Sequence, residues 1–185
     1  MKRIPTYLTL IPFVLFTLIS MLWAQAEPQM PKPGPEHQRL HYFVGNWQTE
    51  LDQKASPIGP GSKVTVTDHN EMLGDFFVVF HRDERGPTES GKEIGIMGYD
   101  SAQKVYTYEH FDDNGDVGRA TATISGDTWV FLWPATDDCK DGGKQQLKGR
   151  ITLKEVSPTS YTFVNEISID GGPWTKLQEA KATKK

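Results

Sequence analysis

The sequence predicts an all-β fold: an up-and-down antiparallel β-barrel of about ten strands, preceded by one short helix. Three observations support this fold. Apolar and polar residues alternate with a period of two over most of the chain after Gly45. Short segments rich in Gly, Asp, Asn, Ser and Pro separate the alternating runs. No helical pattern lies between the runs, so parallel β-α-β units are excluded and sequential strands are expected to be antiparallel.

The first residues have the pattern of a secretory signal peptide. Two basic residues precede an uncharged run from Ile4 to Ala26, and the run ends in small residues at the A-x-A spacing of a cleavage site. An uncleaved membrane anchor is the alternative, since the run is long enough to span a bilayer. We expect residues 1–26 to be removed and the protein to be secreted or periplasmic. Contact with a membrane is then expected only through this segment, during export.

A linker and then the folded domain are expected to follow. Residues 27–34 are rich in proline, which predicts an extended segment without a core of its own. Residues 35–184 are predicted to form the barrel domain. At its start, Pro35 suits the first turn of a helix, and the next apolar residues recur at helical spacing. Gly45 is expected to cap the C-terminus of this helix.

The strands are predicted from the alternating runs. The runs are NWQTELDQ, SKVTVTDHN, DFFVVFH, KEIGIMGYD, KVYTYEHF, VGRATATIS, DTWVFLWPA, QLKGRITLKEV, SYTFVNEISID and PWTKLQEAK. Three connections are predicted to be longer loops, at Lys54–Gly61, Arg82–Gly91 and Pro134–Gly143. The loop Arg82–Gly91 is expected to cover the open mouth of the barrel.

Closure of the sheet is predicted from its edges. An open sheet of this size exposes two edge strands, and only closure removes both. Since about eight strands already enclose one small-ligand cavity, a larger barrel is expected to be hollow. A sandwich of two sheets is the alternative, because it gives the same alternation.

The charge and the cysteine content of the chain limit the partners and the cross-links that it can have. The formal net charge is -4 at pH 7. A mildly acidic chain is not suited to bind nucleic acid, which needs clustered Lys and Arg. Cys139 is the one cysteine, so no internal disulfide can form, and this residue is expected to be a loop thiol. The sequence leaves the oligomeric state open.

The segment PGPEHQRLHYFVGNWQTE resembles the opening of the calycin-type barrels, which include lipocalins and fatty-acid-binding proteins. In those families a short helix precedes a Gly-x-Trp at the start of the first strand. The resemblance implies that Trp47 packs across the closed end of the barrel. Lipocalins place an Arg of the last strand over this Trp, whereas the late strand here offers Lys176 and Lys181, and Lys is not an equivalent stacking partner.

Two further segments resemble the DUF1579 family, a group of bacterial proteins of unassigned function. They are GIMGYDSAQKVYTYEHFDDNG and SYTFVNEISIDGGPWTKLQEAKATKK, and the resemblance covers roughly residues 33–184. The related nitrobindin-like barrels hold haem through a His near the C-terminus. No His follows His110 here, so no haem and no other cofactor is expected.

No metal site is predicted. His69, His81 and His110 lie in three different strands, and no pair has the i, i+2 spacing by which one strand supplies two ligands. The segment DDNGD opens like a calcium loop but lacks the Gly and the Glu that the rest of such a loop requires. It is expected to be a hairpin turn built on Asn114 and Gly115.

An aromatic stripe is the most informative feature for function. Trp129, Phe131 and Trp133 alternate and therefore share one face, and Tyr106 and Tyr108 do the same in another strand. The stripe can be core packing at the closed end, the lining of a ligand cavity, or an exterior patch for a partner. The predicted ligand-binding residues are Trp47, Met97, Tyr106, Tyr108, His110, Arg119, Trp129, Phe131 and Trp133.

The sequence therefore predicts an exported barrel that binds a small hydrophobic or aromatic molecule in its lumen. No catalytic residues are predicted, since no G-x-S-x-G motif is present. An isomerase or hydrolase that uses His110 with a lumen carboxylate is one alternative. Glu109 and Glu166 could face the lumen, but surface or hydrogen-bonded positions are expected for them, because strand parity places Glu109 opposite the Tyr108 face. The other alternative is a filled structural barrel that binds a protein through its exterior.

Overall fold

A computed structural model describes residues 32–56, 61–88, 90–140 and 143–185, with side chains except at 135–145. The predicted signal peptide and most of the predicted linker lie outside these residues. Within the described part of the chain, no helix is both long and apolar enough to cross a membrane.

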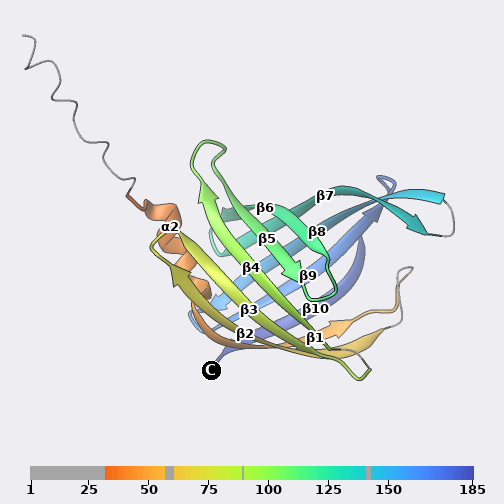
Figure 1. The fold of residues 1–185 in the computed structure, drawn as a ribbon, viewed down its shortest axis with the longest axis horizontal. Helices are drawn as coiled ribbons and strands as arrows, with labels where there is room; N and C mark the ends of the chain where they lie inside the picture. The colour runs from red at the N-terminus through yellow and green to blue at the C-terminus, as the bar shows by residue number, and fades with distance from the viewer. Residues whose placement is uncertain (1–31, 57–60, 89, 141–142) are drawn as a thin grey trace, which may run out of the picture. The chain divides into compact units, whose positions relative to one another are not determined.

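The described residues form a closed antiparallel barrel, as predicted, with one short helix before it (Figure 1). Helix α2 (Pro35–Leu40) is followed by the 3-10 turn η1 (His41–Phe43). The strands are β1 (Gly45–Gln53), β2 (Ser62–Leu73), β3 (Phe77–Arg85), β4 (Ser90–Asp100), β5 (Val105–Asp112), β6 (Val117–Ser125), β7 (Thr128–Lys140), β8 (Gly143–Ser157), β9 (Ser160–Ile169) and β10 (Thr175–Lys184).

Each strand pairs with its neighbours in sequence, and β1 also pairs with β10. The first and last strands therefore meet, with Trp47 opposite Lys184, and the sheet closes on itself. This pairing rules out the two-sheet sandwich and confirms the up-and-down barrel. Closure satisfies the edge strands that an open sheet would expose.

Two of the three predicted loops are wrong in length. β3 and β4 run through most of Arg82–Gly91, and β7 and β8 run through most of Pro134–Gly143. Cys139 consequently lies in a strand and not in a loop. These strand ends are rich in polar residues, which are typical of loops. Backbone hydrogen bonds to the neighbouring strands nevertheless hold them in the ladder. The third predicted loop includes residues 57–60, which are outside the described residues.

Aromatic side chains fill the end of the barrel next to α2. Trp47 is 1 % exposed, and its indole Nε1 donates a hydrogen bond to the carbonyl of Phe43 at 2.8 Å. Its ring packs against Tyr161, with centroids 5.0 Å apart. Phe43 packs against Trp129 at 5.2 Å in the same cluster. Trp47 thus occupies the plug position that the calycin resemblance implied.

The cation over Trp47 comes from a residue that sequence reasoning did not select. Lys184 Nζ lies 5.0 Å from the centre of the Trp47 ring. Lys176 and Lys181, the residues expected there, take no part in this contact. Gly45 has a φ of 115° at the start of β1, and a Cβ there would meet the stem of Lys184. Gly45 therefore leaves room for this lysine, and it is not the helix cap that was predicted, because α2 already ends at Leu40.

Polar contacts fix α2 on the barrel. Arg39 forms an ion pair with Glu155, with Nη2 and Oε1 2.8 Å apart. The same Glu155 oxygen accepts a hydrogen bond from the indole of Trp129 at 2.7 Å. The hydroxyl of Tyr106 donates to the carbonyl of Glu36 at 3.0 Å. The helix and the inner aromatic residues are thereby linked into one end wall.

Small residues on the inner face of β6 make room for the rings of β5. Ala122 lies opposite Tyr106, and both are buried. Ala120 lies opposite Tyr108, and both are again buried. Because residues directly opposite each other in an antiparallel pair share a face, a large side chain on β6 would collide with these rings.

Candidate functional site

A cavity of about 470 Å³ lies inside the barrel beyond the aromatic end wall. This volume falls within the range of small-molecule binding sites, about 300–1,000 Å³. Its lining residues are Phe43, Leu51, Gln53, Val64, Phe80, Arg82, Glu84, Glu93, Met97, Tyr108, His110, Phe131, Trp133, Gly149, Ile151, Leu153, Tyr161, Phe163, Asn165, Ile167 and Gln178. A second hollow of about 440 Å³, lined mainly by the β3–β4 and β5–β6 turns, shares four of these residues.

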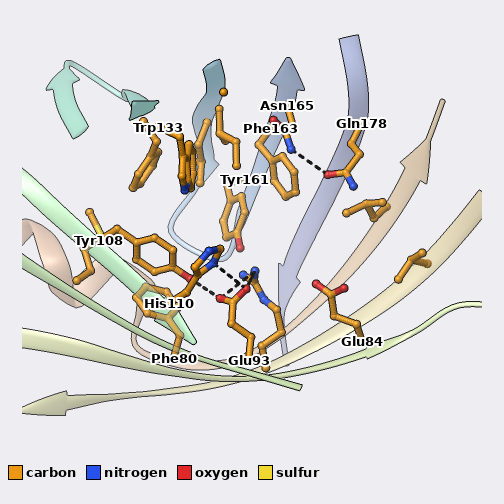
Figure 2. Close-up of a pocket in the computed structure, with 18 of the residues that line it drawn as sticks. Phe80, Glu84, Glu93, Tyr108, His110, Trp133, Tyr161, Phe163, Asn165 and Gln178 are labelled. Carbon is orange, nitrogen blue, oxygen red and sulfur yellow. Dashed lines mark hydrogen bonds and ion pairs between the residues drawn. The ribbon is translucent and has the colours of Figure 1, made fainter. Parts of the chain in front are cut away.

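One side of the cavity is apolar and aromatic. Strands β7, β8 and β9 contribute Trp133, Ile151 and Phe163 to this side, and Figure 2 shows the labelled rings together. Within this region Asn165 donates a hydrogen bond to Gln178 at 3.2 Å. The side-chain amides of Asn165 and Gln178 therefore satisfy part of each other's hydrogen-bonding capacity. An apolar molecule would be desolvated against this wall.

The other side of the cavity carries an ion-pair network on β2, β3 and β4. Arg82 Nε donates to Oδ1 of Asp68 at 2.8 Å, and the Asp68 side chain is only 2 % exposed. Arg82 Nη1 lies 3.4 Å from Oε1 of Glu93. One guanidinium thus compensates two carboxylates that face the lumen. A buried carboxylate without such a partner would be strongly destabilising.

Tyr108 and His110 from β5 complete this network at Glu93. The hydroxyl of Tyr108 donates a short hydrogen bond to Oε1 of Glu93, and His110 Nδ1 lies 3.2 Å from Oε2 (Figure 2). Burial alone would raise the pKa of Glu93, but Arg82 and the two hydrogen bonds outweigh burial and lower this pKa to about 2. The hydrogen bond to Glu93 raises the pKa of His110. Glu93 is therefore ionised at neutral pH, and it favours the protonated form of His110.

A glycine on the neighbouring strand gives the His110 ring its place. Gly118 of β6 lies directly opposite His110, and a Cβ at this position would collide with the imidazole ring. The imidazole reaches Glu93 of β4 with Nδ1 while its Nε2 edge occupies the space beside Gly118, and this space is open only because Gly118 has no side chain. Gly118 is thus small for the same reason as the alanines of β6: a ring of β5 occupies the space where a larger side chain would lie.

Comparison with known proteins places the chain in a family. The model of the family described as "Protein of unknown function (DUF1579)" matches residues 32–184. The chain belongs to the DUF1579 family. No curated protein matches this DUF1579 chain. A similar solved structure is that of Rv2717c from M. tuberculosis, with a TM-score of 0.56 and 11 % sequence identity, covering 83 % of this chain and 99 % of that chain. At this identity the similarity concerns the fold alone.

The structure of the DUF1579 chain distributes the predicted ligand-binding residues over three places. Five of them line the cavity: Met97, Tyr108, His110, Phe131 and Trp133. Three others lie in the buried aromatic cluster outside that lining: Trp47, Tyr106 and Trp129. The aromatic stripe is therefore divided: one part of it lines the cavity, and the other part packs in the core.

The lumen placement of Arg119 is wrong. Its side chain is 72 % exposed and pairs with Glu109 on the outside of the barrel, with Nε and Oε1 3.1 Å apart. Arg119 lies opposite Glu109 in the ladder, and opposite residues share a face. Glu109 is exposed, and Glu166 is partly exposed and paired with Arg150, so the expected surface or hydrogen-bonded positions are confirmed.

Sequence reasoning missed the charged residues of the cavity. Arg82 and Glu84 alternate with Phe80 along β3, and Glu93 lies opposite Arg82 on β4. Strand parity could have placed Arg82 on the face of Phe80. Because charged residues near a turn are usually solvent-exposed, this part of the sequence was instead predicted to be a loop.

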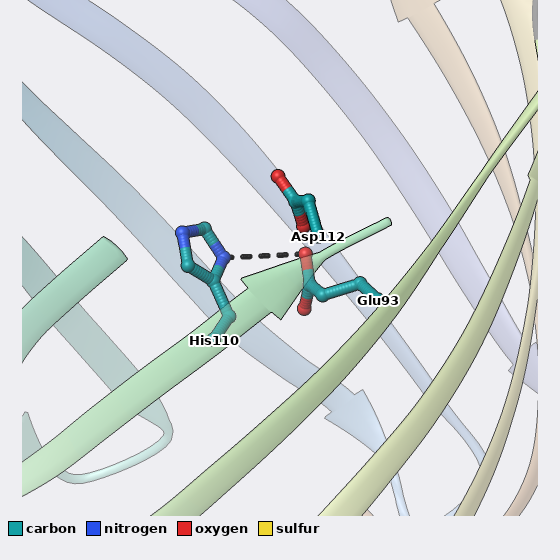
Figure 3. A group of neighbouring side chains, drawn as sticks. All are labelled: Glu93, His110 and Asp112. Atoms are coloured by element: carbon teal, nitrogen blue, oxygen red, sulfur yellow. Dashed lines mark hydrogen bonds and ion pairs between the residues drawn. The ribbon is translucent and has the colours of Figure 1, made fainter. Parts of the chain in front are cut away.

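Glu93, His110 and Asp112 of the DUF1579 barrel have ligand atoms within 4.8 Å of one another (Figure 3). Carboxylate and imidazole are possible ligands of a divalent cation. Both oxygens of Glu93, however, already interact with Arg82, Tyr108 or His110. These internal contacts explain why the three side chains lie close together, and we assign no metal ion to the cluster.

Gly118→Ala should displace the His110 ring from Glu93. The added Cβ collides with the imidazole, so the hydrogen bond to Glu93 is lost and the pKa of His110 falls. The change can be followed by NMR titration of the His110 ring protons. Gly91→Ala is the control, because a Cβ at position 91 has an ordinary contact only. An unaltered His110 titration in Gly118→Ala would contradict this packing.

Proposed function

We propose that this DUF1579 barrel binds a small, largely hydrophobic molecule in its lumen. The observation that supports this function best is the cavity of about 470 Å³ with one aromatic and aliphatic wall. Binding would remove apolar surface of the ligand and of residues such as Trp133 and Phe163 from water. The charged network on the opposite wall would orient the polar part of the ligand.

We also propose that binding takes place outside the cytoplasm. The support is the sequence pattern of residues 1–26, with its basic start, apolar run and A-x-A ending. N-terminal sequencing of the protein from its own cells tests the proposal. A mature chain that begins after Ala26 supports export, and an intact N-terminus on protein recovered from the cytosolic fraction contradicts it.

Ile151→Trp should abolish binding of a neutral apolar probe such as N-phenyl-1-naphthylamine. Ile151 lines the cavity, and the larger, rigid indole at this position would extend into the space in which the probe would lie. We expect the wild-type protein to enhance the fluorescence of the probe saturably and Ile151→Trp to lose this enhancement. Lys154→Trp is the matched control, since it adds the same ring to the exposed outer face of β8. No saturable binding by the wild type, or equal binding by both variants, would refute binding in the lumen.

The pair of His110 and Glu93 supports a second candidate function. An imidazole 3.2 Å from a carboxylate at the edge of an apolar cavity has the geometry of an acid–base pair, as in an isomerase or hydrolase. The test is turnover of ester and ketone substrates. Activity that is lost in His110→Ala but kept in His69→Ala, whose ring pairs with Asn46 on the exposed surface, would support an enzyme.

A further inference from the structure

We propose that the cavity selects amphipathic ligands whose polar group is a cation, such as a primary alkylamine, and discriminates against fatty acids and other carboxylates. This inference rests on the proposed lumen binding and adds the chemical class of the ligand. It follows from the signs and the pairing of the charged groups that surround the lumen.

Carboxylates outnumber cations around the polar side of the cavity. Four carboxylates, from β2 to β5, belong to this region, and among the inward-facing side chains that the structure describes Arg82 and His110 oppose them. The carboxylates are those of Asp68, Glu84, Glu93 and Asp112. Even with His110 protonated, this set has two negative charges in excess. A bound anion would therefore meet net repulsion in a partly desolvated site.

Both cations already have carboxylate partners. The guanidinium of Arg82 is shared between Asp68 and Glu93. The imidazole of His110 points its Nδ1 at Glu93. A ligand carboxylate bound to either cation would lie beside Glu93, whose negative charge would repel it. Neither cation of this wall is therefore free of a neighbouring carboxylate, unlike a cation that serves a fatty-acid ligand alone.

Glu84 is the carboxylate best placed for an incoming cation. It lines the cavity and the adjoining hollow, and it is only partly exposed. Within the described ranges, its carboxylate has no hydrogen bond or ion pair. Burial raises the pKa of Glu84, with a lesser opposing effect from Arg82. An ammonium group against Glu84 would supply the opposite charge that this partly buried carboxylate lacks.

The position of Glu84 also suits the shape of an amphipathic ligand. Figure 2 shows Glu84 and Glu93 facing the wall that contains Trp133, Tyr161 and Phe163. An alkyl chain along that wall would leave its ammonium at the carboxylate side. The adjoining hollow is lined by Asp112 and Asp113 as well as by Lys92, so the excess of carboxylates extends to it.

Three decyl compounds that differ in their polar group test the inference. Decylamine, decan-1-ol and decanoate, at concentrations where each is monomeric, would compete with the bound N-phenyl-1-naphthylamine. We expect decylamine to bind at least about tenfold more tightly than decanoate, with the alcohol between them, because like charges in such a site repel and opposite charges attract. Ile151→Trp should lose binding of all three, which excludes adsorption to the acidic exterior.

Glu84→Gln should bring the affinities of decylamine and decanoate closer together. Asp83→Asn is the matched control, because it removes the same charge one residue away on the outer face of β3. A preference that Asp83→Asn retains and Glu84→Gln reduces supports the assignment. Equal affinities in the wild type, a preference for decanoate, or a preference unchanged in Glu84→Gln would overturn it. In those cases binding of decan-1-ol would still support lumen binding, whereas failure of all three compounds and the probe would refute lumen binding itself.

Discussion

Arg82→Met should lower the free energy of unfolding by about 3–5 kcal/mol at neutral pH, the cost of breaking a buried ion pair by removing one partner. The substitution keeps most of the apolar stem but leaves Asp68, 2 % exposed, without its guanidinium at 2.8 Å. It also removes the guanidinium group that lies 3.4 Å from Glu93. Urea unfolding followed by tryptophan fluorescence measures the loss.

The pH dependence of this loss has a defined sign. The folded state holds the pKa of Glu93 at about 2, below its ordinary value of 4.5. A depressed carboxyl pKa stabilises the fold above the ordinary pKa, and this stabilisation disappears as the pH falls through the folded pKa. The difference in stability between wild type and Arg82→Met should therefore shrink as the pH falls from about 4.5 toward 2.

Two controls separate this effect from a general loss of charge. Arg85→Met removes an exposed cation from the same strand and should change stability by less than about 0.5 kcal/mol. Adding Asp68→Asn to Arg82→Met should recover part of the loss, because the stranded carboxylate is then neutral. A loss in Arg82→Met no larger than that in Arg85→Met would contradict the buried network.

Trp47→Ala should be comparably destabilising, by about 3–5 kcal/mol, as is usual when a buried aromatic residue is truncated. The indole is 1 % exposed, donates to the carbonyl of Phe43 and packs on Tyr161. The truncation would leave a void at the closed end of the barrel and the Phe43 carbonyl without this donor. Thermal and urea unfolding both report the change.

Trp174→Ala is the matched control for the plug. This indole is only partly buried, and Arg150 lies over its ring at 4.3 Å on the outside of the barrel. Its removal should cost only the modest free energy of an exposed cation–π contact, about 0.5–1 kcal/mol. Equal losses in the two variants would show that the closed end does not depend on Trp47.

The period of two along the chain was sufficient to predict the antiparallel strands, but it is equally compatible with a two-sheet sandwich. Closure followed from the edges of a sheet whose strands are joined by short turns, and β1 does pair with β10. The lengths of the strands were harder to predict. Segments such as HRDER on β3 resemble a surface loop, yet ladder hydrogen bonds hold them as strand because the wall extends beyond the apolar core.

The candidate site was only partly predictable, for a related reason. Parity placed Tyr108, His110 and Phe131 on the inner face, where the structure has them. Parity could not distinguish the inward residues that plug the closed end from those that line the cavity. That distinction depends on how far η1 extends into the barrel. Arg82 and Glu93 were missed because their pairing across β3 and β4 depends on the strand register, which a polar hairpin of uncertain length does not reveal.

A crystal structure of the protein with decylamine tests the central claim, ligand binding inside the barrel, most directly. The account predicts density for the alkyl chain against Trp133 and Phe163, with the nitrogen within hydrogen-bonding distance of Glu84 or Glu93. Density on the outer surface only, or a lumen closed by side chains with no ligand inside it, would contradict the account.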